Sequence, residues 1–186
     1  MKESKEIIDR LDRLESKQAI SDLVSSYGTA CDQHDMKKLI GLFTENAEYD
    51  SPNGSMKCVG KKNIEEMFIE IFKTRGPSFH WTHDLIISIN KEDLSMADGI
   101  VYGHAETTRE GEISLAAIRY DDKYSRQEGE WYFSKRSITF HYYFKTEEYT
   151  NTFNKLNRVS MGGEKIAADF PESLEVWKEF HQKNKN

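Results

Sequence analysis

The chain has 186 residues, a length that suits one domain with a hydrophobic core large enough to need no disulfide bonds. Its formal net charge is −6 and its lysines and arginines are scattered, so a general surface for nucleic acid or anionic membrane is disfavoured. We expect no signal peptide and no membrane span, because no apolar run is long enough. Two cysteines without a metal-type spacing indicate a reduced, cytoplasmic protein.

The N-terminal part of the chain predicts helices. Residues 3–17 form a narrow amphipathic pattern, with Ile7, Leu11 and Leu14 at helical spacing among charges. This helix precedes, or continues into, a second helical pattern over residues 19–35, whose apolar stripe consists of Ile20, Leu23, Val24, Tyr27 and Cys31. The stripe becomes polar near its end, where Asp32 flanks it. We therefore expect this end to line a wet or reactive space, the alternative being a solvated aspartate at a fraying helix end.

The middle of the chain alternates short helices and strands before four long strands. Asp35 is expected to cap a short helix over residues 36–43, and a strand over residues 47–50 turns at residues 51–54 into a return strand through Cys58. A helix over residues 61–73 ends at Gly76–Pro77. Long strands are predicted over residues 79–89, 96–108, 112–125 and 130–144. Helices followed by such a meander predict an α+β domain, in which helices close over a curved antiparallel sheet.

The C-terminal segment differs from the rest, so we divide the chain into a domain over residues 1–145 and an extension over residues 146–186. The extension carries a loop at residues 161–163, and Pro171 is placed in the first turn of a helix over residues 172–182. Leu174, Trp177 and Phe180 form an apolar patch on this helix. Such a patch must be covered, either as a lid over a cavity or on another subunit. Together with the apolar face of residues 3–17, it predicts a homo-oligomer, a dimer or a trimer.

Histidines supply the first candidate for chemistry. His80 and His83 lie near the start of the first long strand, and neighbouring strand residues face opposite ways, so the two need not share a compartment. A lone strand histidine is usually structural, although its near-neutral pKa suits acid–base catalysis. His80, His83 and His104 lack a carboxylate–histidine motif of fixed spacing, so no metal ligand is predicted. Cys31, on an apolar helical stripe, is expected to pack rather than to act as a nucleophile.

Several motifs together resemble the SnoaL-like division of the nuclear transport factor 2-like superfamily. They are the helix that ends in Tyr27-xxxx-Asp32, the segment LIGLFTENAEY over residues 39–49, the His80 strand, and Gly129-Glu130-Trp131 at the start of a later strand. The resemblance covers roughly residues 7–144. It implies a cone-shaped half-barrel with a deep pocket, in which a curved antiparallel sheet wraps around N-terminal helices. Relatives include polyketide cyclases, scytalone and bile-acid dehydratases, lindane dehydrochlorinase and non-enzymatic proteins.

The resemblance also implies roles for individual residues. Asp32 and His80 match the Asp–His pair of the dehydrochlorinase, and Tyr27 lies where the dehydratases carry a catalytic tyrosine. Lys135 lies where the dehydrochlorinase carries an arginine, and Arg136 is the alternative because a register slip exchanges the two faces of a strand. An exposed strand charge is an equally good interpretation of Lys135. We expect the walls of the pocket to include Tyr49, Trp81, Tyr102, His104, Arg136 and Phe140, with core packing as the alternative for the aromatic residues.

An Asp–His pair has a clear chemical use. A neutral imidazole accepts a proton well near pH 7, and a carboxylate on its other nitrogen fixes the tautomer and stabilises the imidazolium. We therefore expect a lyase or isomerase, dehydratase-, dehydrohalogenase- or cyclase-like, that acts without a cofactor on a small, largely apolar molecule. The alternatives are a ligand-binding protein without catalytic activity, and a scaffold in which the cavity is incidental.

Overall fold

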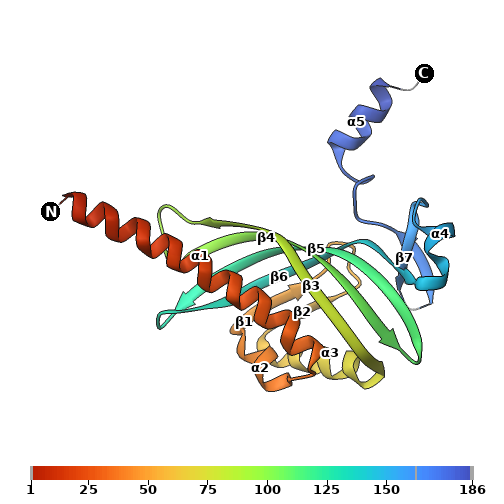
Figure 1. The fold of residues 1–186 in the computed structure, drawn as a ribbon, viewed down its shortest axis with the longest axis horizontal. Coiled ribbons are helices and arrows are strands. Elements are labelled where there is room, and N and C mark those ends of the chain that lie inside the picture. The colour runs from red at the N-terminus through yellow and green to blue at the C-terminus, as the bar shows by residue number, and fades with distance from the viewer. Residues whose placement is uncertain (1, 162, 185–186) are drawn as a thin grey trace.

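The protein is described by a computed structural model that covers residues 2–161 and 163–184 (Figure 1). The helices are α1 (Lys2–Asp32), α2 (Met36–Gly41), α3 (Lys61–Thr74), the 3-10 turn η1 (Thr146–Glu148), α4 (Tyr149–Thr152) and α5 (Glu175–Lys183). The strands are β1 (Phe43–Asp50), β2 (Lys57–Val59), β3 (Arg75–Ile89), β4 (Met96–Arg109), β5 (Glu112–Gln127), β6 (Glu130–Lys145), β7 (Asn157–Met161) and β8 (Glu164–Ala167). None of the helices within the described ranges is long and apolar enough to cross a membrane.

The strands form one curved sheet in the order β2-β1-β6-β5-β4-β3. Its neighbours run antiparallel except for β1 beside β6, and β7 adds a short parallel pairing to β6. The sheet stays open, and α1 lies along it while α2 and α3 sit below (Figure 1). This arrangement confirms the α+β half-barrel predicted from the sequence.

Helix α1 has two halves with different surroundings. In its C-terminal half, Ile20, Val24, Tyr27 and Ala30 are buried against the sheet, which confirms the predicted apolar stripe. The N-terminal half extends past the sheet (Figure 1), and its apolar residues Ile7, Leu11 and Leu14 are exposed. One continuous helix therefore joins a core element to a projecting arm.

The segment after α1 turns sharply. His34 adopts a left-handed conformation (φ 52°), and the Asp35 carboxylate then accepts the backbone N–H of Lys38 at 3.0 Å, as predicted for an N-cap. The predicted extent of α2 was too long, because the helix ends at Gly41 and Phe43 already belongs to β1. Phe43 is fully buried and packs on Phe133 with ring centroids 5.3 Å apart, so tertiary packing decides its conformation.

Strand β3 begins earlier than the sequence predicted. Gly76 and Pro77 were expected to separate the helix from a strand starting at Phe79, whereas β3 pairs with β4 from Arg75 onward. Because β3 lies at the edge of the sheet, a proline without a backbone N–H is tolerated there. The longer strand carries Arg75 beside the sheet's concave face.

The C-terminal extension is tied to the sheet by polar contacts. Arg158 donates to the backbone oxygen of His141 at 2.7 Å and to the carboxylate of Glu172 at 2.8 Å, while Asp169 accepts the backbone N–H of Phe140. The β7–β8 hairpin was not predicted, and of the loop expected at residues 161–163, residue 162 lies outside the described residues. The boundary at residue 145 stays a prediction.

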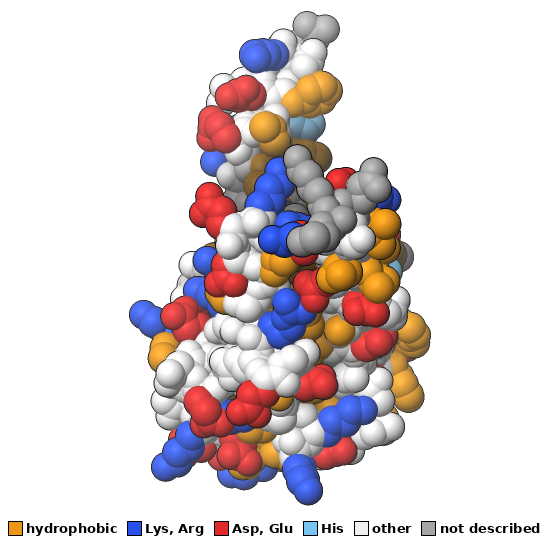
Figure 2. All heavy atoms as spheres, turned by 90° about the vertical axis from the view of Figure 1, so that its left-hand side faces the viewer, with side chains coloured by type: hydrophobic (Ala, Val, Ile, Leu, Met, Phe, Trp, Pro, Cys, Tyr) orange, Lys and Arg blue, Asp and Glu red, His pale blue; other side chains and the backbone are white. Residues whose placement is uncertain are grey.

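The last helix differs from its prediction in extent. Helix α5 starts at Glu175, so Pro171 precedes the helix and is not in its first turn. Figures 1 and 2 show α5 projecting from the body. The side chains of Val176, Trp177 and Phe180 are 72%, 40% and 63% exposed. None of these side chains lines the cavity that contains His80, whereas Trp177 lines a second cavity on the outer face of the sheet. The role of the patch as a lid or as a subunit contact stays a prediction.

Candidate active site

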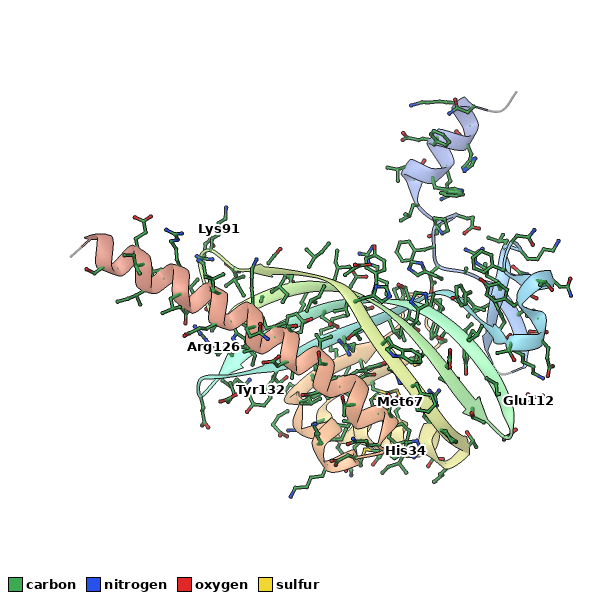
Figure 3. All side chains as sticks on the ribbon, viewed as in Figure 1. His34, Met67, Lys91, Glu112, Arg126 and Tyr132 are labelled. Atoms are coloured by element: carbon green, nitrogen blue, oxygen red, sulfur yellow. The ribbon has the colours of Figure 1, made fainter. Side chains whose placement is uncertain are left out.

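A cavity of about 460 Å³ lies between the concave face of the sheet and helices α1 and α3. Its size falls within the range of roughly 300–1,000 Å³ that is usual for small-molecule sites. Figure 3 shows Met67, one of its wall residues, on α3 below the sheet. Most of the wall is apolar or aromatic and includes Met67, Phe68, Ile71, Phe72, Ile118, Ile138 and Phe140. Such a wall favours an apolar ligand.

The structure brings Asp32 and His80 together, although 48 positions separate them in the sequence. Asp32 ends α1, and its carboxylate accepts twice from the same residue of β3. The backbone N–H of His80 donates to Oδ2 at 2.9 Å, and the ring Nδ1 lies 2.5 Å from Oδ1. These two contacts fix both the position and the plane of the imidazole. His80 lines the cavity, whereas Asp32 lies behind it.

The carboxylate determines which ring nitrogen is basic. An ionised carboxylate only accepts hydrogen bonds, so Nδ1 carries the proton and Nε2 of a neutral imidazole keeps its lone pair. Burial disfavours the imidazolium and lowers the pKa of His80 below its usual 6.5, although the hydrogen bond that His80 donates to Asp32 acts in the opposite direction. At neutral pH the ring is therefore neutral and able to take a proton.

Tyrosine hydroxyls form the polar end of the cavity. Tyr27 of α1 and Tyr49 of β1 both line it, with their hydroxyl oxygens 3.1 Å apart. Burial raises the pKa of Tyr49 to about 12 and that of Tyr27 well above its ordinary value. Cys31, also in the wall, has its pKa raised to about 12 by burial. These groups stay protonated at neutral pH, so they donate hydrogen bonds and are not bases.

Arg136 lies fully buried beneath the cavity. Its Nε and Nη2 donate to the two carboxylate oxygens of Asp122 at 2.9 and 2.7 Å, and Tyr124 donates to the same carboxylate at 2.8 Å. The guanidinium carbon lies 4.1 Å from the ring centroids of Tyr27, Tyr120 and Phe133. The predicted wall residue is thus one layer deeper, where its charge acts through the tyrosine rings.

The predicted placement of Lys135 in the cavity is wrong. Its ammonium group donates to Asp50 at 2.6 Å and to Glu48 at 3.0 Å, on the opposite face of β6 from Arg136. Adjacent residues of a strand point to opposite faces, so the sheet register that buries Arg136 turns Lys135 outward. Of the two residues, Arg136 is the one on the inner face of β6, although neither lines the cavity.

Three further residues expected in the cavity lie on the outer, convex face. Trp81 follows His80 in β3 and is 52% exposed, and Tyr102 and His104 of β4 line a separate outer cavity of about 420 Å³. His104 and Trp81 are register partners, whereas His80 pairs with Ala105, which faces inward. Strand alternation explains all three corrections. Tyr49 and Phe140 line the inner cavity as expected.

Sequence reasoning missed several inner residues. The cavity wall also includes Arg75, Thr107, Arg109, Tyr120 and Tyr143. Thr107 and Arg109 follow Ala105 at steps of two, and Tyr120 follows Ile118 in the same way. Alternation counted from the His80–Ala105 partnership would have found Thr107 and Arg109, but the register was unknown, and an irregularity between Arg75 and Ser78 breaks the alternation before Arg75. Within the described part of the chain, no cluster of three or more histidine, cysteine or acidic side chains has the geometry of a metal site.

Comparisons with known proteins agree with the fold. A family model described as a SnoaL-like domain matches residues 12–137, more than half of the chain. Gamma-hexachlorocyclohexane dehydrochlorinase of Sphingobium indicum is 27% identical over 141 residues, which cover 72% of this chain and 85% of that protein.

Solved structures give the same picture. A type 2 hexachlorocyclohexane dehydrochlorinase shares 22% identity with a TM-score of 0.67, over 73% of this chain and 92% of that one. A scytalone dehydratase-like protein of Novosphingobium aromaticivorans shares 18% identity with a TM-score of 0.65, over 72% and 89% of the two chains. These structures are similar in fold. The chain belongs to the SnoaL-like domain family, as the resemblance in its sequence indicated.

Proposed function

We propose that the protein is a lyase or isomerase in which His80 is the general base and Asp32 its partner. The observation that carries the proposal is the double contact of the Asp32 carboxylate with the backbone N–H and the Nδ1 of His80, beside an apolar cavity. It leaves Nε2 as the basic atom of a neutral ring beside a largely apolar wall. The kinship with a dehydrochlorinase supports the same class of reaction.

In an elimination, Nε2 of His80 takes a proton from a carbon of the substrate. The electron pair of that C–H bond forms the new double bond, and the leaving group departs with its own bonding pair. Either hydroxyl of the Tyr27–Tyr49 pair donates to the other, so the accepting hydroxyl keeps a proton free to hydrogen-bond the departing anion. Arg136 lies beneath Tyr27 and Tyr120, but Asp122 balances its charge, so the hydroxyl proton is the group that meets this anion.

The same base beside a carbonyl group would give isomerisation or cyclisation, because the proton is then returned to another atom and nothing leaves. The geometry of His80 is identical in the two cases. Release of halide or water identifies an elimination, and deuterium incorporation from heavy water without release identifies an isomerisation.

A turnover screen tests the proposal. We would incubate the wild-type protein with gamma-hexachlorocyclohexane and with a panel of halogenated and hydroxylated cyclic compounds, and follow products and halide. His80→Gln should lower the rate by roughly 10²-fold or more. His83→Gln, three residues away on the outer face, is the matched control and should leave the rate unchanged. Binding of several panel compounds with no turnover of any would instead favour a ligand-binding protein.

A further inference from the structure

Two arginines line the cavity that contains His80. Arg75 is the first residue of β3 and Arg109 the last of β4, and both belong to the cavity wall. They are direct register partners across the antiparallel pair. Residues opposite one another in such a pair lie on the same face of the sheet, and like charges in this position destabilise the pairing. The sheet therefore holds two positive charges together at one edge of the cavity.

Protein carboxylates do not neutralise these charges. Within residues 2–161 and 163–184, neither arginine has an ion-pair partner, and two neighbouring acids bind lysines instead. Glu70 lines the same cavity but binds Lys73 at 2.5 Å. Glu112 is the register partner of Arg109 in β5 but binds Lys145 at 2.5 Å. Two guanidinium groups thus keep their donors available beside an apolar cavity.

The arginines and the base face the same space. Burial is the main cause of the lowered pKa of His80, and the positive charge of Arg75 lowers it further, so the two groups interact electrostatically. A ligand anchored at the arginines by an anionic end would extend its apolar body along the wall that contains Phe68, Ile118 and Phe140. Its body would then lie in the cavity into which His80 presents Nε2.

We propose that the substrate is an apolar carboxylic acid whose carboxylate binds Arg75 and Arg109. A guanidinium group presents a planar fork of donors that matches the two oxygens of a carboxylate, and such charge-assisted bonds are the strong ones. The apolar wall selects the body of the acid, and the arginines select its charge and its orientation. This inference rests on the proposed function for the statement that the bound acid is also the molecule that reacts.

A binding experiment with a matched pair of ligands tests the proposal. We would titrate the full chain with 2-naphthylacetate and with 2-naphthylacetamide, which share an apolar body and differ in charge, at low and at moderate salt. The wild type should bind the acid roughly tenfold or more tightly than the amide, with the preference reduced by salt. Arg75→Gln and Arg109→Gln should each remove most of the preference and leave the affinity for the amide unchanged.

Lys91→Gln is the matched control, because it removes one positive charge at the far end of β3 from the cavity (Figure 3). It should keep the preference for the acid. Equal affinity of the wild type for acid and amide, or a preference that survives both arginine substitutions, would overturn the proposal.

The two proposals fail separately. Asp32→Asn should lower turnover by roughly 10²-fold or more, while the preference for the acid remains, because both arginines stay in the cavity wall. Turnover of neutral compounds by a wild type that binds acid and amide equally would refute the carboxylic acid and keep the general base. A preference for the acid in a protein that turns over no compound would keep the binding site and refute the catalytic role.

Discussion

His80 and His83 lie three residues apart on β3, and each has an aspartate beside it. The two His–Asp pairs nevertheless differ in the cavity that they face, in solvent exposure and in how firmly the ring is held. His80 faces the inner cavity and lies 2.5 Å from Asp32, which comes from a different element. His83 faces outward, 3.0 Å from its sequence neighbour Asp84, with 42% and 78% of the two side chains exposed. The inner pair is largely desolvated and held in one orientation, whereas the outer pair is solvated.

A histidine close to an aspartate is therefore not enough for a general base. The inner carboxylate is fixed by the end of a 31-residue helix and accepts from both backbone and ring of His80. The outer aspartate has a left-handed backbone (φ 50°) beside an irregularity of the β3–β4 pairing, and its contact spans one residue. A solvated pair of this kind contributes little energy, while the inner pair sets a tautomer.

The largest effect is expected from breaking the inner pair. In Asp32→Asn, the amide oxygen can still accept the backbone N–H of His80, but the amide nitrogen then faces Nδ1 and favours a proton on Nε2. The basic lone pair would point away from the cavity, so the rate should fall by roughly 10²-fold or more. Asp84→Asn, the same change in the outer pair, should have no effect on the rate. Equal rates for both variants would refute the distinction.

The two faces of β6 offer a second comparison, in stability. Arg136→Met leaves the buried carboxylate of Asp122 without its charged partner and should lower the free energy of unfolding by about 3–5 kcal/mol. Lys135→Met on the outer face removes partly exposed ion pairs and should lower the free energy of unfolding by only about 0–1 kcal/mol. Chemical denaturation measures both.

Adding Asp122→Asn to Arg136→Met provides the check on the mechanism. This double variant should recover part of the lost stability, because no unpaired carboxylate remains buried. A double variant less stable than Arg136→Met alone would show that the charge of Asp122 is not the cause.

The pH dependence follows from the lowered pKa of His80. Between that pKa and 6.5, the unfolded protein binds a proton at this histidine that the folded protein does not, so stability falls as the pH decreases through this window. Above 6.5 the contribution of His80 is fully present. The acid limb of kcat/KM should likewise have its midpoint below 6.5. A midpoint above 6.5 would mean that the contact with Asp32 outweighs burial.

The sequence predicted the inner pair better than the cavity around it. The helical stripe pointed to Asp32 and the family resemblance to both Asp32 and His80, whereas no pattern in the sequence pointed to Arg75 or Tyr120. The side on which a strand residue faces depends on register and on irregularities, and one of these falls between Arg75 and Ser78. The same uncertainty put Lys135, Trp81 and His104 on the wrong face.

The fold was predictable where hydrophobic periodicity is strong, and not where tertiary contacts decide. The stripe of α1 and the four long strands follow the pattern of buried residues. Strand β7 has no such pattern, and it is placed by the contacts of Arg158 with His141 and Glu172.

The smallest effect is expected at the termini, which we still predict to join subunits. The apolar faces of α1 and α5 are exposed, and burying them against another subunit would be energetically favourable. Phe180→Glu should therefore lower the mass in solution measured by light scattering at low concentration. Lys178→Glu, on the same helix, is the control and should leave the mass unchanged. A monomeric wild type would refute this prediction, but it would not affect the role proposed for Asp32 and His80.

The tautomer of His80 tests the central claim most directly, because it needs no substrate. Nitrogen-15 NMR of the histidine rings distinguishes a protonated Nδ1 from a protonated Nε2, and His80→Gln and His83→Gln assign the two signals. We expect His80 to be neutral at pH 7, with the proton on Nδ1, and to titrate below 6.5, with this behaviour lost in Asp32→Asn. A proton on Nε2 at neutral pH, or a signal that Asp32→Asn does not change, would contradict the role of the inner pair as a base.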